Sequence, residues 1–175
     1  MKIQLITLSF VSLLVSCSSF NEFGSRRSKL NIEKIKPNNN DEAYKIIDTS
    51  KIYKLVNINI TNDERLSYDL NGMNNRNPKY LKFYKNGRVG EFRNINLNDI
   101  DNFNPKRAES HLYQLKKGKL IVQEYFKSPQ CGECFVKSFV SKVSENQITF
   151  TSENNIETYE KIEIPTSFLI YKPDW

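Results

Sequence analysis

The chain has 175 residues, 38% of them hydrophobic and 12% aromatic, with a net charge of +6. This length suits one domain with a single core, and the aromatic content argues against a disordered chain. The basic balance does not indicate a nucleic-acid partner, because lysines and glutamates are interspersed and no arginine-rich or aromatic-basic motif occurs.

The first residues have the pattern of an export signal. Met1-Lys2 gives a positive start, and the uncharged run from Ile3 to Ser16 is about 14 residues long, against roughly 20 for a membrane-spanning helix. The sequence Leu14-Val15-Ser16-Cys17 resembles the lipobox of bacterial lipoproteins. The resemblance implies cleavage before Cys17 and acylation of this cysteine, with palmitate as a typical acyl chain. An ordinary signal peptide with an incidental cysteine is the alternative.

This interpretation divides the chain into a signal peptide (1–16), a lipidated tether (17–40) and a folded domain (41–175). Two or three acyl chains would anchor the protein durably, whereas one chain binds a membrane only marginally. Ser18 is compatible with outer-membrane sorting, so we expect a lipid-anchored envelope protein that faces the periplasm. The polar, aperiodic tether predicts a flexible linker that holds the domain roughly 25 Å from the bilayer. Its basic residues suit either contact with anionic head groups or simple solvation.

The first half of the domain alternates strand patterns with turns. A short helical segment is expected over 41–48, and the period-two pattern of Lys51–Ile60 predicts a strand. The polar stretch Thr61–Pro78 is predicted to be a long connection and a candidate lid. Asn86-Gly87 lies between two apolar runs and predicts a hairpin with a type I′ turn.

The second half predicts a meander. Asn94–Arg107 is expected to be a solvated connection, since Phe103 occupies the position of a third oxygen ligand in a calcium loop. The segment Phe135–Val143 fits either a strand or a helix. Strands are predicted over 111–115, 119–126, 147–150 and 156–164, followed by a short packed segment over 168–171.

Counting these runs gives an all-β domain of about eight antiparallel strands, arranged as an up-and-down barrel or a sandwich. Four segments carry a resemblance to uncharacterised small lipoproteins of the flavobacterial group, several of them lipocalin-like: 80–92, 104–107, 159–165 and 171–175. The resemblance covers roughly residues 44–175. It implies a small lipocalin-like barrel and transfers no catalytic residue.

Cys131 and Cys134 form a CxxC motif in a compartment that favours disulfides. One interpretation is a structural disulfide that closes a turn. The other is a thioredoxin-type thiol–disulfide oxidoreductase, supported by the proline Pro165 but opposed by the short chain that remains after Thr166.

No other constellation indicates catalysis, and we expect no metal and no cofactor. His111 is the only histidine and has no cysteine or carboxylate at ligand spacing. The expected function is therefore non-enzymatic: binding of a small apolar ligand, or scaffolding of an envelope partner. An eight-stranded barrel is just wide enough for one small ligand. The residues proposed to line such a cavity are Tyr80, Phe83, Phe92, Tyr125 and Phe139.

Overall fold

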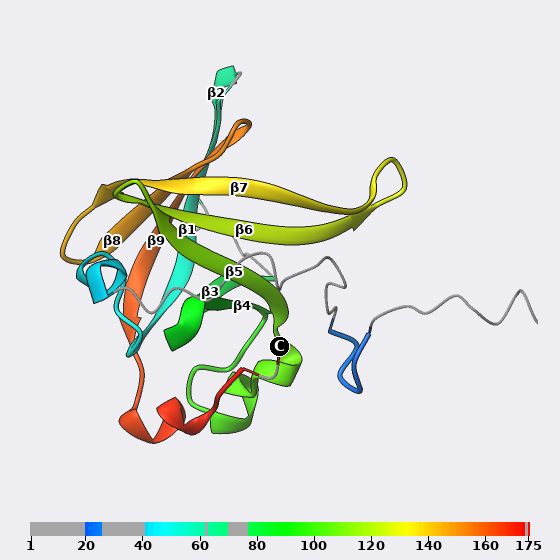
Figure 1. The fold of residues 1–175 in the computed structure, drawn as a ribbon, viewed down its shortest axis with the longest axis vertical. Coiled ribbons are helices and arrows are strands. Elements are labelled where there is room, and N and C mark those ends of the chain that lie inside the picture. Colours follow the sequence, from blue (N-terminus) through cyan, green and yellow to red (C-terminus); the bar gives the residue numbers. More distant parts are fainter. Residues whose placement is uncertain (1–19, 26–40, 62, 70–76, 174) are drawn as a thin grey trace, which may run out of the picture.

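A computed structural model describes residues 20–25, 41–61, 63–69, 77–173 and 175 (Figure 1). The predicted signal peptide, Cys17 and most of the predicted tether lie outside these residues. Over the described residues the fold is all-β, with nine antiparallel strands and only short 3-10 turns. None of the described helices is long and apolar enough to cross a membrane.

The strands are β1 (Lys51–Ile60), β2 (Asp63–Asp69), β3 (Lys79–Phe83), β4 (Arg88–Arg93), β5 (Glu109–Lys116), β6 (Lys119–Ser128), β7 (Gly132–Val143), β8 (Gln147–Thr151) and β9 (Asn155–Glu163). The 3-10 turns are η3 (Asp41–Lys45), η4 (Lys85–Gly87), η5 (Ile100–Phe103), η6 (Pro105–Arg107) and η7 (Thr166–Ile170).

Strand β1 closes the sheet into a barrel. It pairs with β9 along its whole length and with β3 through Tyr53 and Lys54. The closed barrel has eight strands, which confirms the predicted antiparallel barrel. β3 pairs with only two residues of β1, which would leave the second half of that edge of β1 unpaired. Strand β2 pairs with this part of β1 through four residue pairs. The prediction of a long connection over Thr61–Pro78 is therefore wrong for Asp63–Asp69, which form a strand.

Two of the hairpin turns depend on a glycine with positive φ. Lys117 and Gly118 both have positive φ, as a type I′ turn between β5 and β6 requires. The predicted hairpin at Asn86-Gly87 is confirmed, but its turn type is wrong. The loop is the three-residue η4, in which Gly87 has a φ of 76°, and the Tyr84 N–H donates to the Arg88 carbonyl over 2.9 Å. This longer loop keeps Tyr84 and Arg88 paired on the same face of the hairpin.

One end of the barrel is filled with aromatic rings. Phe83 contacts Tyr53 and Tyr113 edge-on, with centroids 5.1 and 5.5 Å apart, and stacks on Phe150. Phe150 contacts Tyr159 at 5.6 Å. The turn η3 covers this end and adds buried apolar side chains to the same core. This half of the barrel interior is therefore packed.

A second core lies outside the barrel, on the outer face of β3 and β4. Tyr80 and Phe92 are opposite one another there and pack against Phe103 of η5. The turn η7 adds Phe168, whose ring is 5.0 Å from that of Phe103. All five residues of β3 are buried as a result, because both of its faces are covered.

Candidate functional site

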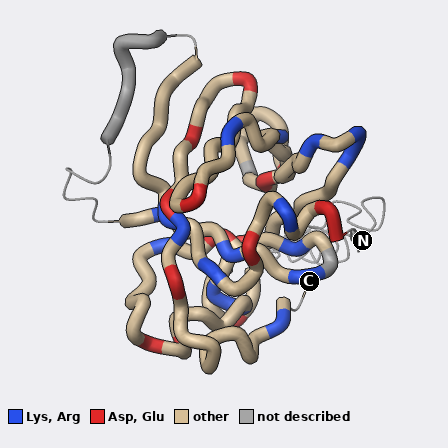
Figure 2. The backbone as a smooth tube through the Cα atoms, turned by 90° about the vertical axis from the view of Figure 1, so that its left-hand side faces the viewer, with Lys and Arg blue, Asp and Glu red and all other residues tan. Residues whose placement is uncertain are grey.

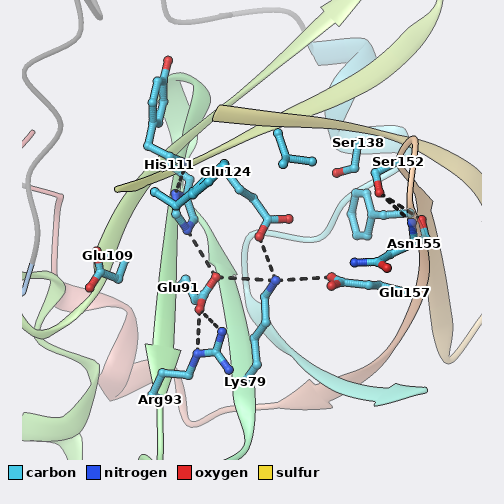
Figure 3. A pocket seen from close by; sticks show the side chains of 14 residues that line it. Lys79, Glu91, Arg93, Glu109, His111, Glu124, Ser138, Ser152, Asn155 and Glu157 are labelled. Carbon is cyan, nitrogen blue, oxygen red and sulfur yellow. Dashed lines mark hydrogen bonds and ion pairs between the residues drawn. The ribbon is translucent and has the colours of Figure 1, made fainter. Parts of the chain in front are cut away.

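The inward faces of the strands change from apolar to ionisable along the barrel. Near η3 these faces carry Phe83, Val89, Tyr113, Val122 and Tyr159. Toward the opposite end they carry Lys79, Glu91, His111, Glu124 and Glu157, which lie together in Figure 3. Successive inward residues on one strand are two positions apart, so each strand contributes to both layers.

Lys79 lies at the centre of the ionisable layer. Its Nζ atom is 2.7 Å from Glu124 Oε2, 3.2 Å from Glu157 Oε2 and 3.5 Å from Glu91 Oε2 (Figure 3). Burial alone would lower the pKa of Lys79, but Tyr159 and the three carboxylates outweigh it and hold the pKa well above its usual value. The amine therefore stays protonated.

Glu91 has three basic neighbours. Its Oε1 atom accepts from Arg93 Nε at 2.6 Å, and its Oε2 atom is 3.3 Å from His111 Nε2. Burial raises the pKa of Glu91, whereas the His111 hydrogen bond and the charges of Lys79 and Arg93 lower it further, so the pKa is well below its usual value. Glu91 is therefore a permanent carboxylate at neutral pH.

Hydrogen bonds define the state of the His111 ring. The Tyr125 backbone N–H donates to Nδ1 over 3.1 Å, so in the neutral ring the hydrogen is on Nε2, which faces Glu91. Glu91, His111 and Glu124 have ligand atoms within 4.8 Å of one another, a spacing that a metal ion could use. However, the Lys79 ammonium already contacts both carboxylates and Nε2 carries a proton. The arrangement fits an ion-pair network better than a metal site.

The mouth pocket, defined as the cavity above this layer, has a volume of about 420 Å³. Its polar lining contains the carboxylates of Glu91, Glu109, Glu124 and Glu157 against two fixed cations, Lys79 and Arg93. Phe126 and Val136 supply an apolar wall. Ser138 faces the pocket from β7 and is 6% exposed, yet its Oγ atom has no hydrogen-bond partner. Such an orphaned buried hydroxyl is uncommon in a folded protein.

The structure does not bring the five predicted ligand-lining aromatics together. Phe83 belongs to the packed inner core, while Tyr80 and Phe92 lie in the outer core. Tyr125 borders the mouth pocket, and Phe139 is exposed on the outer surface of β7. The reason is the alternation of strand side chains, since both faces of β3 and β4 are covered and an aromatic residue on either face is buried.

Sequence reasoning missed the ionisable layer and the partners of His111. The available signal was a charged residue that continues an apolar alternation: Lys79 follows the series of Phe83 and Leu81, and Glu124 follows Val122. Without strand register, inward and outward series could not be distinguished, because both series on β3 and β4 mix apolar with charged residues.

Cys131 and Cys134 form a disulfide at the tip of the β6–β7 hairpin, with Cα atoms 5.9 Å apart. A thioredoxin-type site requires a helix after the first cysteine, which lowers the pKa of its thiol. Here the extended strand β7 follows instead. The hairpin geometry therefore favours the structural interpretation.

Part of the predicted tether contacts the domain. Glu22 pairs with Lys106 of η6 at 2.8 Å, and the Arg107 guanidinium lies 4.7 Å from the centroid of the Phe23 ring. Asn21 donates to the Lys106 carbonyl. Figure 1 shows this blue N-terminal segment beside the green turns of residues 100–107.

Comparison with known proteins gave no assignment: no protein-family model, curated protein or solved structure matches the chain.

Proposed function

We propose that the protein is a non-enzymatic lipoprotein, anchored through Cys17, whose barrel binds a small polar ligand in the mouth pocket. The observation that carries this proposal is the orphaned Ser138 hydroxyl in a cavity with excess carboxylate. The eight-stranded antiparallel barrel is consistent with the lipocalin-like fold that the sequence resemblance implied.

The chemistry of the pocket selects a ligand rich in hydrogen-bond donors. Both fixed cations, Lys79 and Arg93, already contact glutamates. Glu109 forms no ion pair within the described part of the chain, so its charge remains available at the rim. An amine or a polyhydroxyl compound would satisfy Glu109 and Ser138 together. A volume of about 420 Å³ lies within the range of small-molecule sites.

An apolar ligand at the barrel centre, as the sequence suggested, has less support. That region contains the packed rings of Tyr53, Phe83 and Phe150, whereas the open space is lined by charged residues. Burying an apolar ligand there would desolvate the carboxylates without replacing their hydrogen bonds.

The test of binding begins with native mass spectrometry of the mature protein extracted from its own membranes. A co-purifying amine or polyhydroxyl compound of low mass is expected. Calorimetry with ethanolamine and succinate then provides a defined comparison, in which ethanolamine binds and succinate does not.

Ser138→Ala should weaken ethanolamine binding about 5-fold, since one hydrogen bond is worth roughly 1 kcal/mol. It should not reduce the melting temperature, because the hydroxyl has no partner in the folded protein. Glu153→Gln is the matched surface control. Equal binding of succinate and ethanolamine, or no bound compound with either method, would refute the polar-ligand proposal.

The anchor has its own test. Mass spectrometry of the N-terminal peptide should show acyl mass on Cys17, and Cys17→Ser should release the protein from the membrane fraction. An unmodified Cys17 thiol would contradict the anchor and leave the mouth-pocket proposal intact.

One observation favours scaffolding as a second candidate function. The β6–β7 hairpin projects beyond the rest of the barrel (Figure 1) and exposes Phe135 and Phe139 on its outer face, opposite the face whose Phe126 and Val136 line the mouth pocket. Exposed apolar patches of this kind mark docking sites for other proteins. Cross-linking in membranes should then capture a discrete envelope protein, and Phe135→Ser should abolish the cross-link while Ser138→Ala preserves it.

A further inference from the structure

A second cavity, the outer groove, lies on the opposite face of β3 and β4 from the barrel interior. It has a volume of about 1160 Å³ between these strands and the C-terminal segment. Its lining is Thr49, Ser50, Lys82, Phe83, Tyr84, Lys85, Arg88, Phe103, Phe168, Leu169, Tyr171, Lys172, Pro173 and Trp175. Four of these described residues are basic and none is acidic, which is the reverse of the mouth pocket.

This concentration of charge is local. Figure 2 shows lysine and arginine interspersed with aspartate and glutamate along the backbone. A cavity with basic residues alone is therefore a property of this groove and not of the whole surface.

Two of the cations have no ion-pair partner within the described structure: Lys82 is buried and Arg88 is half-buried. Lys82 is 5% exposed, and its Nζ atom donates to two backbone carbonyls, those of Thr49 and Phe83. Arg88 has a buried Nη1 atom without a hydrogen-bond partner. Across the described ranges, neither side chain has a carboxylate within 4.0 Å. Burying a charge is costly unless it is paired with an opposite charge, and neither group has such a partner among the described residues.

Strand register places these two cations on one face. Lys82 is directly opposite Gly90, and Arg88 is two residues before Gly90 on the same strand. Residues two apart on a strand face the same side, so Lys82 and Arg88 are diagonal neighbours, about 7–8 Å apart at their backbones. A single oxyanion with several acceptor atoms can contact an ammonium and a guanidinium at that spacing.

Aromatic side chains flank the cations. Lys82 Nζ is 5.5 Å from the Tyr84 ring centroid, and Tyr84 meets Trp175 at 6.1 Å and a right angle. Gly90 lets the Tyr84 ring and the Ala108 side chain lie close to the β4 backbone, since a Cβ atom at Gly90 would be 3.3 Å from Tyr84 Cε2 and 3.0 Å from Ala108 Cβ. The groove thus combines unpaired cations with an apolar wall.

We propose that the outer groove binds an organic anion, with a carboxylate or phosphate head between Lys82 and Arg88 and an apolar body against Tyr84, Phe168 and Trp175. The head supplies the missing counter-charge. The volume greatly exceeds that of an inorganic ion, and the aromatic wall gives the remaining space an apolar surface. This site shares no lining residue with the mouth pocket and does not depend on the proposed function.

The test uses the mature full-length chain and the fluorescent probe 1-anilinonaphthalene-8-sulfonate, an aromatic anion. Saturable binding at one site is expected. Lys82→Met and Arg88→Met should each weaken it at least 10-fold. Both variants should fold at least as stably as the parent, because Lys82→Met removes a buried unpaired charge and Arg88→Met removes a half-buried one. Circular dichroism and the melting temperature verify folding.

The control variant is Lys137→Met, which removes an exposed cation 5.1 Å from the Phe135 ring and should leave binding unchanged. Competition with oleate, inorganic phosphate and phosphatidylglycerol vesicles identifies the source of the anion. Displacement by oleate supports a free organic acid, and displacement by the vesicles supports a phospholipid head group with its acyl chains. If only inorganic phosphate displaces the probe, the ligand does not need an apolar body and the organic-anion proposal is overturned. Binding that survives Lys82→Met and Arg88→Met would overturn the site.

Discussion

At the scale of single residues, the barrel contains buried charges of two kinds. Glu91 is a buried carboxylate with three basic neighbours, whereas Lys82 is a buried ammonium that donates to backbone carbonyls. Pairing lowers the pKa of Glu91, and burial lowers the pKa of Lys82 to about 8. Both groups therefore couple stability to pH, but for different physical reasons and in different pH ranges.

Glu91→Gln should destabilise the fold by about 3 kcal/mol at pH 7, because it removes a negative charge that compensates Lys79 and Arg93 in a buried ionic network. The folded-state pKa of Glu91 lies below its ordinary value of 4.5, so its contribution is fully present above pH 4.5 and is lost as the pH falls toward the folded value. Urea unfolding should thus show a large difference between parent and variant at pH 7 and a smaller one near pH 3. Glu153→Gln, on the exposed β8–β9 turn, should show no difference at either pH.

Lys82→Met should stabilise the protein by about 1–3 kcal/mol at pH 7, because methionine retains most of the apolar stem and removes an unpaired buried charge. The folded pKa of about 8 is below the ordinary value of 10.5, so the parent gains stability as the pH rises from 8 to 10.5. The advantage of the variant should shrink over that interval in urea unfolding. A loss of stability at pH 7 would show that the charge of Lys82 is already compensated.

At the scale of elements, the alternating sequence pattern predicted where strands occur better than it predicted which of their side chains point into the barrel. The strands predicted over Lys51–Ile60 and residues 119–126 are present, and the second extends to Ser128. The segment Phe135–Val143 fits either form, because Phe135, Phe139 and Val143 repeat at helical spacing while both strand faces carry apolar groups. Pairing with β6 and β8 selects the strand. The positions of Lys79 and Glu91 depended on long-range register, which no local pattern encodes.

The position of the Cys131–Cys134 disulfide in the β6–β7 hairpin indicates a small structural role. The disulfide closes a small loop at the tip of a hairpin that projects beyond the barrel, so the entropic gain is small. The double variant Cys131→Ser/Cys134→Ser should lose no more than about 1–2 kcal/mol of stability and keep its barrel. Purified protein should not accelerate the reduction of insulin. Turnover that disappears in Cys131→Ser would reinstate the redox enzyme.

At the scale of the whole molecule, two strands build two sites of opposite charge. Lys79 and Glu91 face the barrel interior, whereas Lys82 and Arg88 face the outer groove. The two sites are separated because the side chains of odd-numbered and even-numbered residues on β3 and β4 point to opposite faces of the sheet. A ligand in one site therefore does not contact the other, and the two binding tests can be interpreted independently.

The attachment of residues 20–25 predicts how the barrel lies relative to the membrane. Cys17 precedes Phe20 by three residues, which span at most about 10 Å. Since Glu22 and Phe23 contact η6, an acylated Cys17 would hold the domain close to the bilayer and not at the end of a long tether. Energy transfer from the single tryptophan, Trp175, to dansyl lipid in vesicles measures this distance.

Lys106→Glu should reduce that energy transfer, because it places a second carboxylate beside Glu22 and repels the segment from η6. The exchanged pair Glu22→Lys/Lys106→Glu restores opposite charges and should recover much of the signal, which separates the contact itself from a general effect of surface charge. Lys116→Glu, an exposed lysine at the β5–β6 turn, is the matched control. If the parent and Lys106→Glu transfer energy equally, the contact does not position the anchored domain.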